Sequence, residues 1–342
     1  MARVWTATAT APVRIADLGG WTDTWFAGRG EVCSLAVRPG VEVELTAVPG
    51  SGSVVIDAVD LADRYDLSEG RGRHPLLEAC VDEVGVPPGL DVTVTIRSAV
   101  PPGASTGTSA AVLVAVIGAL DALAGDRRPP ADVAARAHRV ETVRVGRQAG
   151  IQDQWAAAHG GANRIRMSRY PDGVVVLPLD LPPQVRRALE ARLLLVLLGR
   201  PHASSAVHDQ VIAGLEGADA VTVDARLEPL RAAARDGAAA LEAGDLPAYG
   251  RALIDSTEAQ RALHPGLVAP DATTAFAAAM GTGAIGWKVN GAGGDGGSLT
   301  LLAGPDDGDR DRMAVAVEAA VPGASARTVT LDDEGLRVRP VG

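Results

Sequence analysis

Hydrophobic and polar residues alternate through much of the first hundred positions, which is the pattern of half-buried strands. The alternation is clearest in three segments rich in β-branched residues, at Val41–Val48, Ser53–Val59 and Leu90–Ile96. A period of two places every second side chain on the same face of a sheet. We therefore expect a sheet in this part of the chain, with one helix, His74–Val84, between its strands.

Apolar helices are expected next. The strongest candidate, Thr108–Leu123, consists almost entirely of Ala, Val and Leu, and a helix that is apolar nearly all round belongs in the centre of a domain. A second helix is expected at Ala131–Arg147, behind a Pro-Pro pair, and a third at Ile151–Ala158, which stops before two glycines.

The second half of the chain combines a few short strands with Ala-rich helices. Strands are expected at Arg192–Leu198, Ala284–Val289 and Ser298–Leu302, helices at Val223–Leu241, Leu246–His264, Thr273–Met280 and Arg312–Ala320, and an acidic surface loop at Gly304–Asp311. The linker-like composition around Pro182-Pro183 predicts two domains, 1–183 and 184–342. Strands and helices without regular alternation predict an α+β fold.

Composition and charge exclude several classes of function. The 342 residues carry a formal net charge of −10, so we expect neither nucleic acid nor an anionic membrane as partner. The longest apolar stretch, Ala110–Leu120, is shorter than the roughly 20 residues that span a bilayer, and the N-terminus lacks a signal-peptide pattern. We expect a cytoplasmic protein in which Cys33 and Cys80 are reduced core thiols, without a zinc site.

A loop of small residues, VPPGASTGTSAA at Val100–Ala111, precedes the most apolar helix. The first N–H groups of a helix lack internal partners and lie in positive potential, and Gly103 and Gly107 let the backbone approach an anion closely. This arrangement is typical of a phosphate-binding loop, although an ordinary helix cap with a tight turn would look similar. A Walker A loop is excluded, because the Gly-Lys-Ser/Thr sequence is missing.

This loop resembles the phosphate loop of the GHMP kinases, the superfamily of galactokinase, homoserine kinase, mevalonate kinase and phosphomevalonate kinase. The sequence departs from the family pattern at Ser105, Thr106 and Thr108 and keeps both glycines, the following serine and the two alanines. The resemblance implies ATP as cosubstrate, an N-terminal domain like ribosomal protein S5 domain 2 and a ferredoxin-like C-terminal domain. The ATP-binding residues it implies are Pro102, Gly103, Ala104, Ser105, Thr106, Gly107, Thr108 and Ser109.

Two more motifs strengthen this resemblance. The N-terminal string GGWTDT resembles the substrate motif of L-fucose kinases and heptose 7-phosphate kinases, but Trp25-Phe26 replaces the usual Pro-Pro. The string KVNGAGGDGG resembles the C-terminal glycine motif, with Asp295 as a departure that we expect to point away from phosphates. The substrate-binding residues that these motifs imply are Gly20, Thr22, Asp23, Gly291, Gly293 and Gly294.

The resemblance also implies the catalytic groups. Asp153, in the segment GIQDQ, would be the catalytic base, and Arg14 would stabilise developing charge beside it. Glu141 and the hydroxyl of Ser109 would hold Mg²⁺, which prefers oxygen ligands. From the residues alone, Asp153 could instead cap a helix and Glu141 could lie on a solvated helix face.

Further substrate contacts are expected from Asn163, after the Gly160-Gly161 turn, and from Arg200 and Ser204 in the segment GRPHASS. An arginine and paired hydroxyls suit a sugar phosphate, but an ordinary polar loop is an equal alternative.

We therefore expect a sugar kinase of unknown oligomeric state, acting on a sugar or sugar phosphate. The first interpretation is the anomeric hydroxyl of a heptose 7-phosphate, because the chain is too short for the second activity that fucose enzymes often carry. An L-fucose kinase or other sugar 1-kinase is the nearest alternative. A non-catalytic sugar sensor and an ATP-dependent decarboxylase are more distant alternatives.

Overall fold

The computed structural model describes residues 4–200 and 206–341. Nine strands form the first sheet, in the order β13-β1-β2-β5-β3-β4, with β6 and β12 paired with β2, and β7 paired with β6. Their bounds are β1 (Trp5–Leu18), β2 (Gly30–Pro49), β3 (Val54–Ala58), β4 (Asp63–Asp66), β5 (Leu90–Ser98), β6 (Ala162–Met167), β7 (Val174–Pro178), β12 (Thr330–Leu331) and β13 (Arg337–Val341). The long strand β2 reaches two neighbours in turn, pairing with β6 through residues 30–35 and with β5 through residues 41–49.

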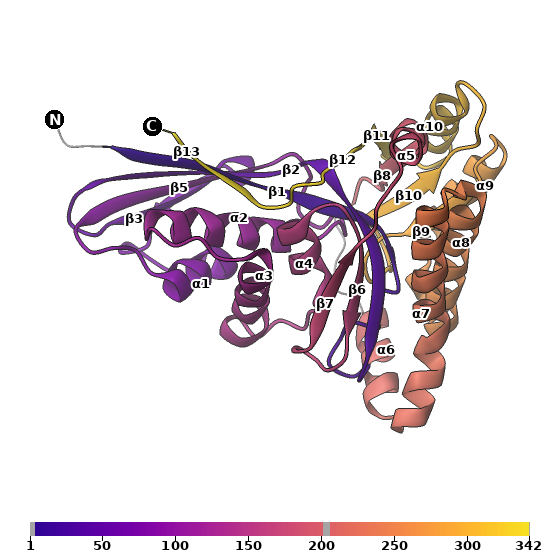
Figure 1. Cartoon of the computed structure of the whole chain (residues 1–342), viewed down its shortest axis with the longest axis horizontal. Helices are drawn as coiled ribbons and strands as arrows, with labels where there is room; N and C mark the ends of the chain where they lie inside the picture. Colours follow the sequence, from indigo (N-terminus) through magenta and orange to yellow (C-terminus); the bar gives the residue numbers. More distant parts are fainter. Residues whose placement is uncertain (1–3, 201–205, 342) are drawn as a thin grey trace.

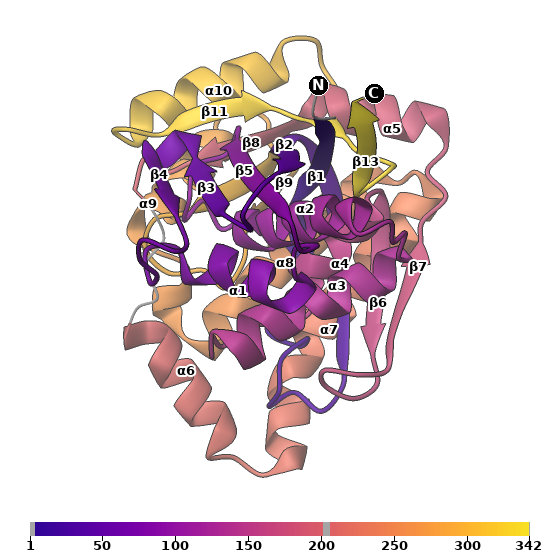
Figure 2. The same cartoon turned by 90° about the vertical axis from the view of Figure 1, so that its left-hand side faces the viewer.

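Helices of the N-terminal half cover one face of this sheet (Figures 1 and 2). They are α1 (Pro75–Val84), α2 (Thr108–Leu123), α3 (Pro130–Arg139) and α4 (Gln152–His159), with the short 3₁₀ turn η1 (Val59–Leu61) between β3 and β4 and the π turn η2 (Val140–Arg144) after α3. Helix α2 contacts β1, β2, α1, α3 and α4. Because it is surrounded on all sides, an almost uniformly apolar sequence is what this position requires.

The second unit is built on a four-stranded antiparallel sheet in the order β11-β8-β10-β9. Its strands are β8 (Leu193–Leu197), β9 (Gly286–Val289), β10 (Ser298–Leu302) and β11 (Ser325–Thr328). Its helices are α5 (Pro183–Arg192), α6 (Ala206–Glu216), α7 (Ala220–Ala243), α8 (Leu246–Leu263), the 3₁₀ turn η3 (Pro265–Leu267), α9 (Pro270–Met280) and α10 (Asp309–Ala320).

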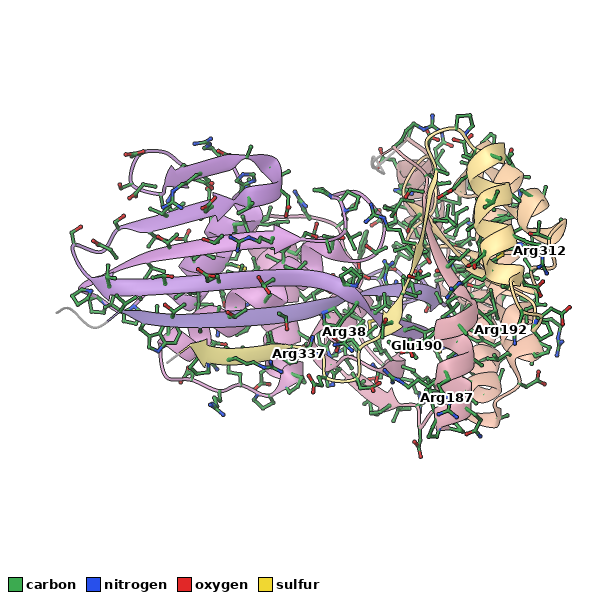
Figure 3. All side chains as sticks on the ribbon, turned by 90° about the horizontal axis from the view of Figure 1, so that it is seen from above. Arg38, Arg187, Glu190, Arg192, Arg312 and Arg337 are labelled. Atoms are coloured by element: carbon green, nitrogen blue, oxygen red, sulfur yellow. The ribbon has the colours of Figure 1, made fainter. Side chains whose placement is uncertain are left out.

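The end of the chain joins the two units. Strands β12 and β13 return to the first sheet, where they pair with β2 and β1. Between them, the buried carboxylate of Asp332 accepts from Arg337 at 2.8 Å and lies 3.3 Å from Arg38, and both arginines lie at the junction of the units in Figure 3. Apart from these two strands, the first sheet lies within residues 5–178 and the second within residues 193–328.

The predicted α+β architecture is confirmed, and Thr108–Leu123 is a helix with the predicted bounds. The helix predicted for Ala131–Arg147 ends earlier, because its last turn is the π turn η2. The predicted acidic loop is wrong at its end, since Asp309 is buried and begins α10. Among the described residues, no helix is both long and apolar enough to cross a membrane.

Candidate active site

The loop between β5 and α2 forms the floor of the candidate site. Gly103, Ser105 and Gly107 have φ angles of 75°, 57° and 70°, so the chain turns three times through the left-handed region. Glycine adopts this region without steric cost, whereas another residue there costs roughly 1 kcal/mol or more. The departure from the family pattern at Ser105 therefore falls on a position where the backbone favours glycine.

Arg14, on β1, connects this loop to α4. Its guanidinium donates to both carboxylate oxygens of Asp153, at 2.8 Å and 3.3 Å, and to the carbonyl oxygen of Ser105. The Arg14 side chain is 5% exposed and that of Asp153 is 30% exposed. The arginine of this pair is thus buried, whereas the carboxylate is partly accessible to solvent. Helix α4 begins after Ile151, so Asp153 is not its N-cap.

Asp17 is a buried carboxylate that the sequence analysis missed. It lies within an irregularity in the pairing of β1 with β2, between Ile15 and Leu18, and its two oxygens each accept from the N–H of Gly291 at 3.0 Å. The Arg14 guanidinium lies 3.6 Å away. Irregularities of this kind redirect side chains next to functional sites. No sequence pattern distinguishes this aspartate from an ordinary strand-end residue.

The C-terminal glycine motif packs directly on the phosphate loop. A Cβ atom added to Gly291 would lie 3.2 Å from the Cβ of Ser105 and 3.4 Å from a guanidinium nitrogen of Arg14. The hydroxyl of Ser298 donates to the carbonyl oxygen of Ala104 at 2.6 Å. All three motifs therefore meet around Arg14.

Asp23 lies against the segment that leads into α4. Its Oδ2 atom accepts from the N–H of Gln152 at 3.0 Å, and a Cβ atom on Gly150 would lie 2.2 Å from that oxygen. Burial raises the pKa of Asp23 to about 6, the nearby Asp153 carboxylate adds to the rise, and the bond from Gln152 opposes it. Above that pH a carboxylate faces the cavity and can accept hydrogen bonds from hydroxyl groups.

We expect Asp23→Asn to change how stability depends on pH. The folded-state pKa is raised, so the wild type holds a proton at Asp23 that the unfolded chain loses near pH 4. The protonated carboxyl group therefore contributes to the free energy of unfolding in full below pH 4. This contribution is lost as the pH rises to 6, where the folded protein also releases the proton. Relative to Asp23→Asn, the wild type should lose about 3 kcal/mol of unfolding free energy over this range, measured by urea denaturation without ligands. A constant difference between the variants would contradict this assignment.

Glu141 belongs to the π turn and is buried, so the alternative of a solvated helix face does not hold. Its Oε2 atom accepts from the side-chain amide of Gln154 at 2.7 Å. Burial raises the pKa of Glu141 to about 7, and the Asp153 carboxylate adds to the rise. Glu141 and the exposed Ser109 line the same cavity. Their oxygens suit Mg²⁺, but no group of three His, Cys, Asp or Glu residues in the described chain could hold a metal ion by itself, so nucleotide oxygens would have to complete the shell.

Two cavities meet at the start of α2. The larger, of about 660 Å³, includes Arg14, Asp23, Gly103, Ala104, Ser105, Gly107, Glu141, Asp153 and Gly291 in its lining. The smaller, of about 380 Å³, has an apolar lining that includes Leu61, Leu76, Leu77, Ile96 and Val112. Thr108, Ser109 and Arg147 line both cavities, so the two form neighbouring compartments on either side of one helix terminus.

Aromatic residues form one wall of the larger cavity. Trp21, Trp25 and Phe26 line it together with His208 and Ile212 of α6. The indole N–H of Trp21 donates to the carbonyl oxygen of Ala292 at 3.1 Å, and its ring meets that of His208 edge-on at 5.7 Å. The Trp25-Phe26 departure noted in the sequence is therefore a feature of the cavity itself.

Other predicted site residues do not line the larger cavity. Asn163 is buried on β6, where it donates to the carbonyl oxygen of Gly160, and Arg200 pairs with Asp271 and Asp295. The hydroxyl of Thr22 donates to the carbonyl oxygens of Gly19 and of Glu31, at the start of β2. The other predicted site residues that do not line the larger cavity are Gly20, Thr106, Gly293, Gly294 and Pro102. Of these, Pro102 lines the smaller cavity. Ser204 lies outside the described residues. Asp295 is exposed, as expected for a residue that points away from phosphates.

A family model and several solved structures are similar to this chain. Residues 75–161 match the family model of the GHMP kinases N terminal domain. This segment is therefore similar to that domain, and the chain shares its fold over 96–98% of its length with solved kinase structures. Members of this family are kinases.

Particular relatives include both sugar kinases and mevalonate kinases. The D-glycero-D-manno-heptose 1-phosphate kinase of Bacteroides thetaiotaomicron superposes with a TM-score of 0.76 at 20% identity, covering 98% of this chain and 99% of that one. The Lactococcus lactis galactokinase complexed with galactose gives 0.77 at 18% identity, covering 97% and 95%. In sequence, the mevalonate kinase of Thermococcus onnurineus is 28% identical over 254 residues, 74% of this chain and 70% of that protein.

A longer relative is the L-fucokinase/L-fucose-1-P guanylyltransferase of Bacteroides fragilis. It is 23% identical over an alignment of 365 residues. The alignment covers 96% of this chain but 38% of that protein, so this chain corresponds to part of it.

Proposed function

We propose that the protein is an ATP-dependent sugar kinase that transfers the γ-phosphate of Mg·ATP to a hydroxyl group of a sugar or sugar phosphate. One observation carries this proposal: the Asp153 carboxylate lies directly beside the phosphate loop. A Cβ atom on Gly107 would come within 3.2 Å of the Asp153 Cγ atom. A base at that point can take the proton of a hydroxyl that attacks a phosphate held by the loop.

The two cavities divide the substrates between them. The apolar lining of the smaller cavity suits a nucleoside, and the N-terminus of α2 with residues 103–109 would hold the phosphates. Glu141 and Ser109 would hold Mg²⁺, which neutralises charge on the phosphates when bound. Arg14 stabilises the Asp153 carboxylate and fixes its orientation through two hydrogen bonds.

The larger cavity suits a sugar as acceptor. Its aromatic wall offers a surface for the apolar face of a sugar ring, and the carboxylate of Asp23 can accept from sugar hydroxyls. The anomeric hydroxyl of a heptose 7-phosphate is our first assignment, and L-fucose or another free sugar is the alternative. The site contains the groups that phosphoryl transfer requires, namely Arg14, Glu141 and Asp153. Their presence supports an enzyme over a non-catalytic sugar sensor.

An ADP-release assay with a panel of acceptors tests this function. The panel contains D-glycero-D-manno-heptose 7-phosphate, L-fucose, L-arabinose, galactose and, as a non-sugar, mevalonate. We expect ADP release that depends on both Mg²⁺ and one of the sugars. Release with mevalonate alone would assign a different acceptor class, and sugar binding without release would favour the sensor.

We expect Gly107→Val to weaken ATP binding by at least about tenfold, because the new side chain would occupy space beside Asp153 at a residue with φ of 70°. Isothermal titration calorimetry measures this change. Gly125→Val is the matched control, since Gly125 also has a positive φ, of 82°, but has no atom within 4 Å of an added Cβ. It should cost stability without changing the affinity for ATP. Equal affinities in Gly107→Val and the wild type would place the nucleotide elsewhere.

A further inference from the structure

Arg147 lies where the two cavities meet. Its side chain lines both of them, together with Thr108 and Ser109 at the N-terminus of α2. The residue follows the π turn η2, and its backbone N–H donates to the carbonyl oxygen of Glu141 at 3.0 Å. Turns of this type are frequent at functional sites. Residues 145–150 thereby place a guanidinium group beside the phosphate loop.

The site needs a cation that its phosphate loop does not contain. Phosphoryl transfer depends on neutralising charge on the transferred group, yet residues 100–109 include neither lysine nor arginine. Arg14 is committed to Asp153 and to the Ser105 carbonyl. Lys288 is 1% exposed, donates to Gln260 and to the carbonyl of Val289, and lines neither cavity.

The other basic side chains of the two cavities also have protein partners. In the smaller cavity, Arg73 and His74 both contact the carboxylate of Asp63. Within the part of the chain that the structure describes, no hydrogen bond or ion pair within 4 Å joins the guanidinium of Arg147 to protein, although its charge lowers the pKa of the nearby Glu141 carboxyl group. Its neighbour Arg144 differs, because it pairs with Glu83 at 2.8 Å.

We propose that Arg147 binds the γ-phosphate of ATP and stabilises the charge on it during transfer. This inference rests on the proposed kinase function. In the reaction, the bond between the γ-phosphorus and the oxygen that remains on ADP breaks, a bond to the acceptor oxygen forms, and the acceptor's proton passes to Asp153. Arg147 stays charged throughout and contacts the non-bridging oxygens, for which a planar guanidinium is well suited.

Nucleotide binding separates this inference from the function on which it depends. Calorimetry would compare Mg·AMPPNP with Mg·ADP for the wild type, Arg147→Ala, Arg147→Lys and the control Arg144→Ala. We expect Arg147→Ala to weaken AMPPNP binding by about tenfold and ADP binding by much less, with partial recovery in Arg147→Lys. With an acceptor found in the panel, kcat should fall by about a hundredfold or more, while Arg144→Ala keeps wild-type values.

Other results of the nucleotide titrations would separate a failure of the proposed kinase function from a failure of the Arg147 contact. A wild type that binds neither nucleotide would end the proposed function itself. The wild type could bind both nucleotides while Arg147→Ala binds them equally well, or binds both more weakly by the same factor. Either result would overturn the contact between Arg147 and the γ-phosphate and leave the proposed kinase function standing. Arg147→Gln provides a second uncharged variant if the alanine variant shows a reduced melting temperature.

Discussion

Asp153→Asn should lower kcat by about two to four orders of magnitude, the usual contribution of a positioned general base. An asparagine keeps the shape of the side chain but cannot accept the proton of the attacking hydroxyl. The affinity for ATP should change little, because in the proposed function the loop would bind the phosphates through backbone N–H groups. Steady-state kinetics with the acceptor from the panel, together with nucleotide calorimetry, would measure both effects.

Asp172→Asn is the control for this variant. Asp172 is 69% exposed and pairs with Arg169 in a surface loop, so the same change of charge there should leave kcat within about twofold. Full activity in Asp153→Asn would remove Asp153 as base. Loss of ATP binding with normal catalysis at saturation would give it a role in nucleotide binding instead.

The second large effect is expected for Arg14→Ala, which should cost about 3–5 kcal/mol of unfolding free energy and abolish measurable turnover. The substitution removes the Arg14 guanidinium, 3.6 Å away, from the buried Asp17 carboxylate, which is 0% exposed. It also removes the only side-chain bonds that join α4 to the Ser105 carbonyl among the described residues. Urea denaturation and the kinetic assay would report the two losses separately.

Arg29→Ala is a matched control, because Arg29 also pairs with two carboxylates but is 54% exposed. Its loss should cost no more than about 1 kcal/mol. Arg14→Lys should recover part of the stability but little of the activity, since an ammonium group cannot donate in the same fork geometry. Wild-type stability in Arg14→Ala would contradict the central role that we give to this residue.

Local sequence patterns predicted local structure well. Helix α2 has the predicted bounds because an uninterrupted apolar run begins just after Gly107, and both features are visible in a short window. Strand β1 was missed because its Ala- and Thr-rich sequence alternates weakly. Its stability comes from pairing with β2 on one side and β13 on the other. The β13 partners are more than 300 positions away, such as Val338 opposite Ala9.

Some residues of the candidate site could be predicted from sequence motifs, and others could be found only from the structure. Arg14, Gly107, Glu141 and Asp153 belong to motifs that the sequence displays, and they line one cavity. Asp17 and Arg147 carry no motif of their own. Asp17 is distinguished from ordinary charged residues only by the groups that surround it in the structure, and Arg147 only by its place in the lining of both cavities.

The sequence by itself determined the class of fold, the loop before α2 and the segments that contain most of the candidate residues. The tertiary structure alone decided which of these residues meet. Arg14 and Asp153 are 139 positions apart, and Asp17 and Gly291 are 274 apart. Contacts over such separations depend on how the two sheets and their helices pack together, because the local conformation of each segment is compatible with many relative placements.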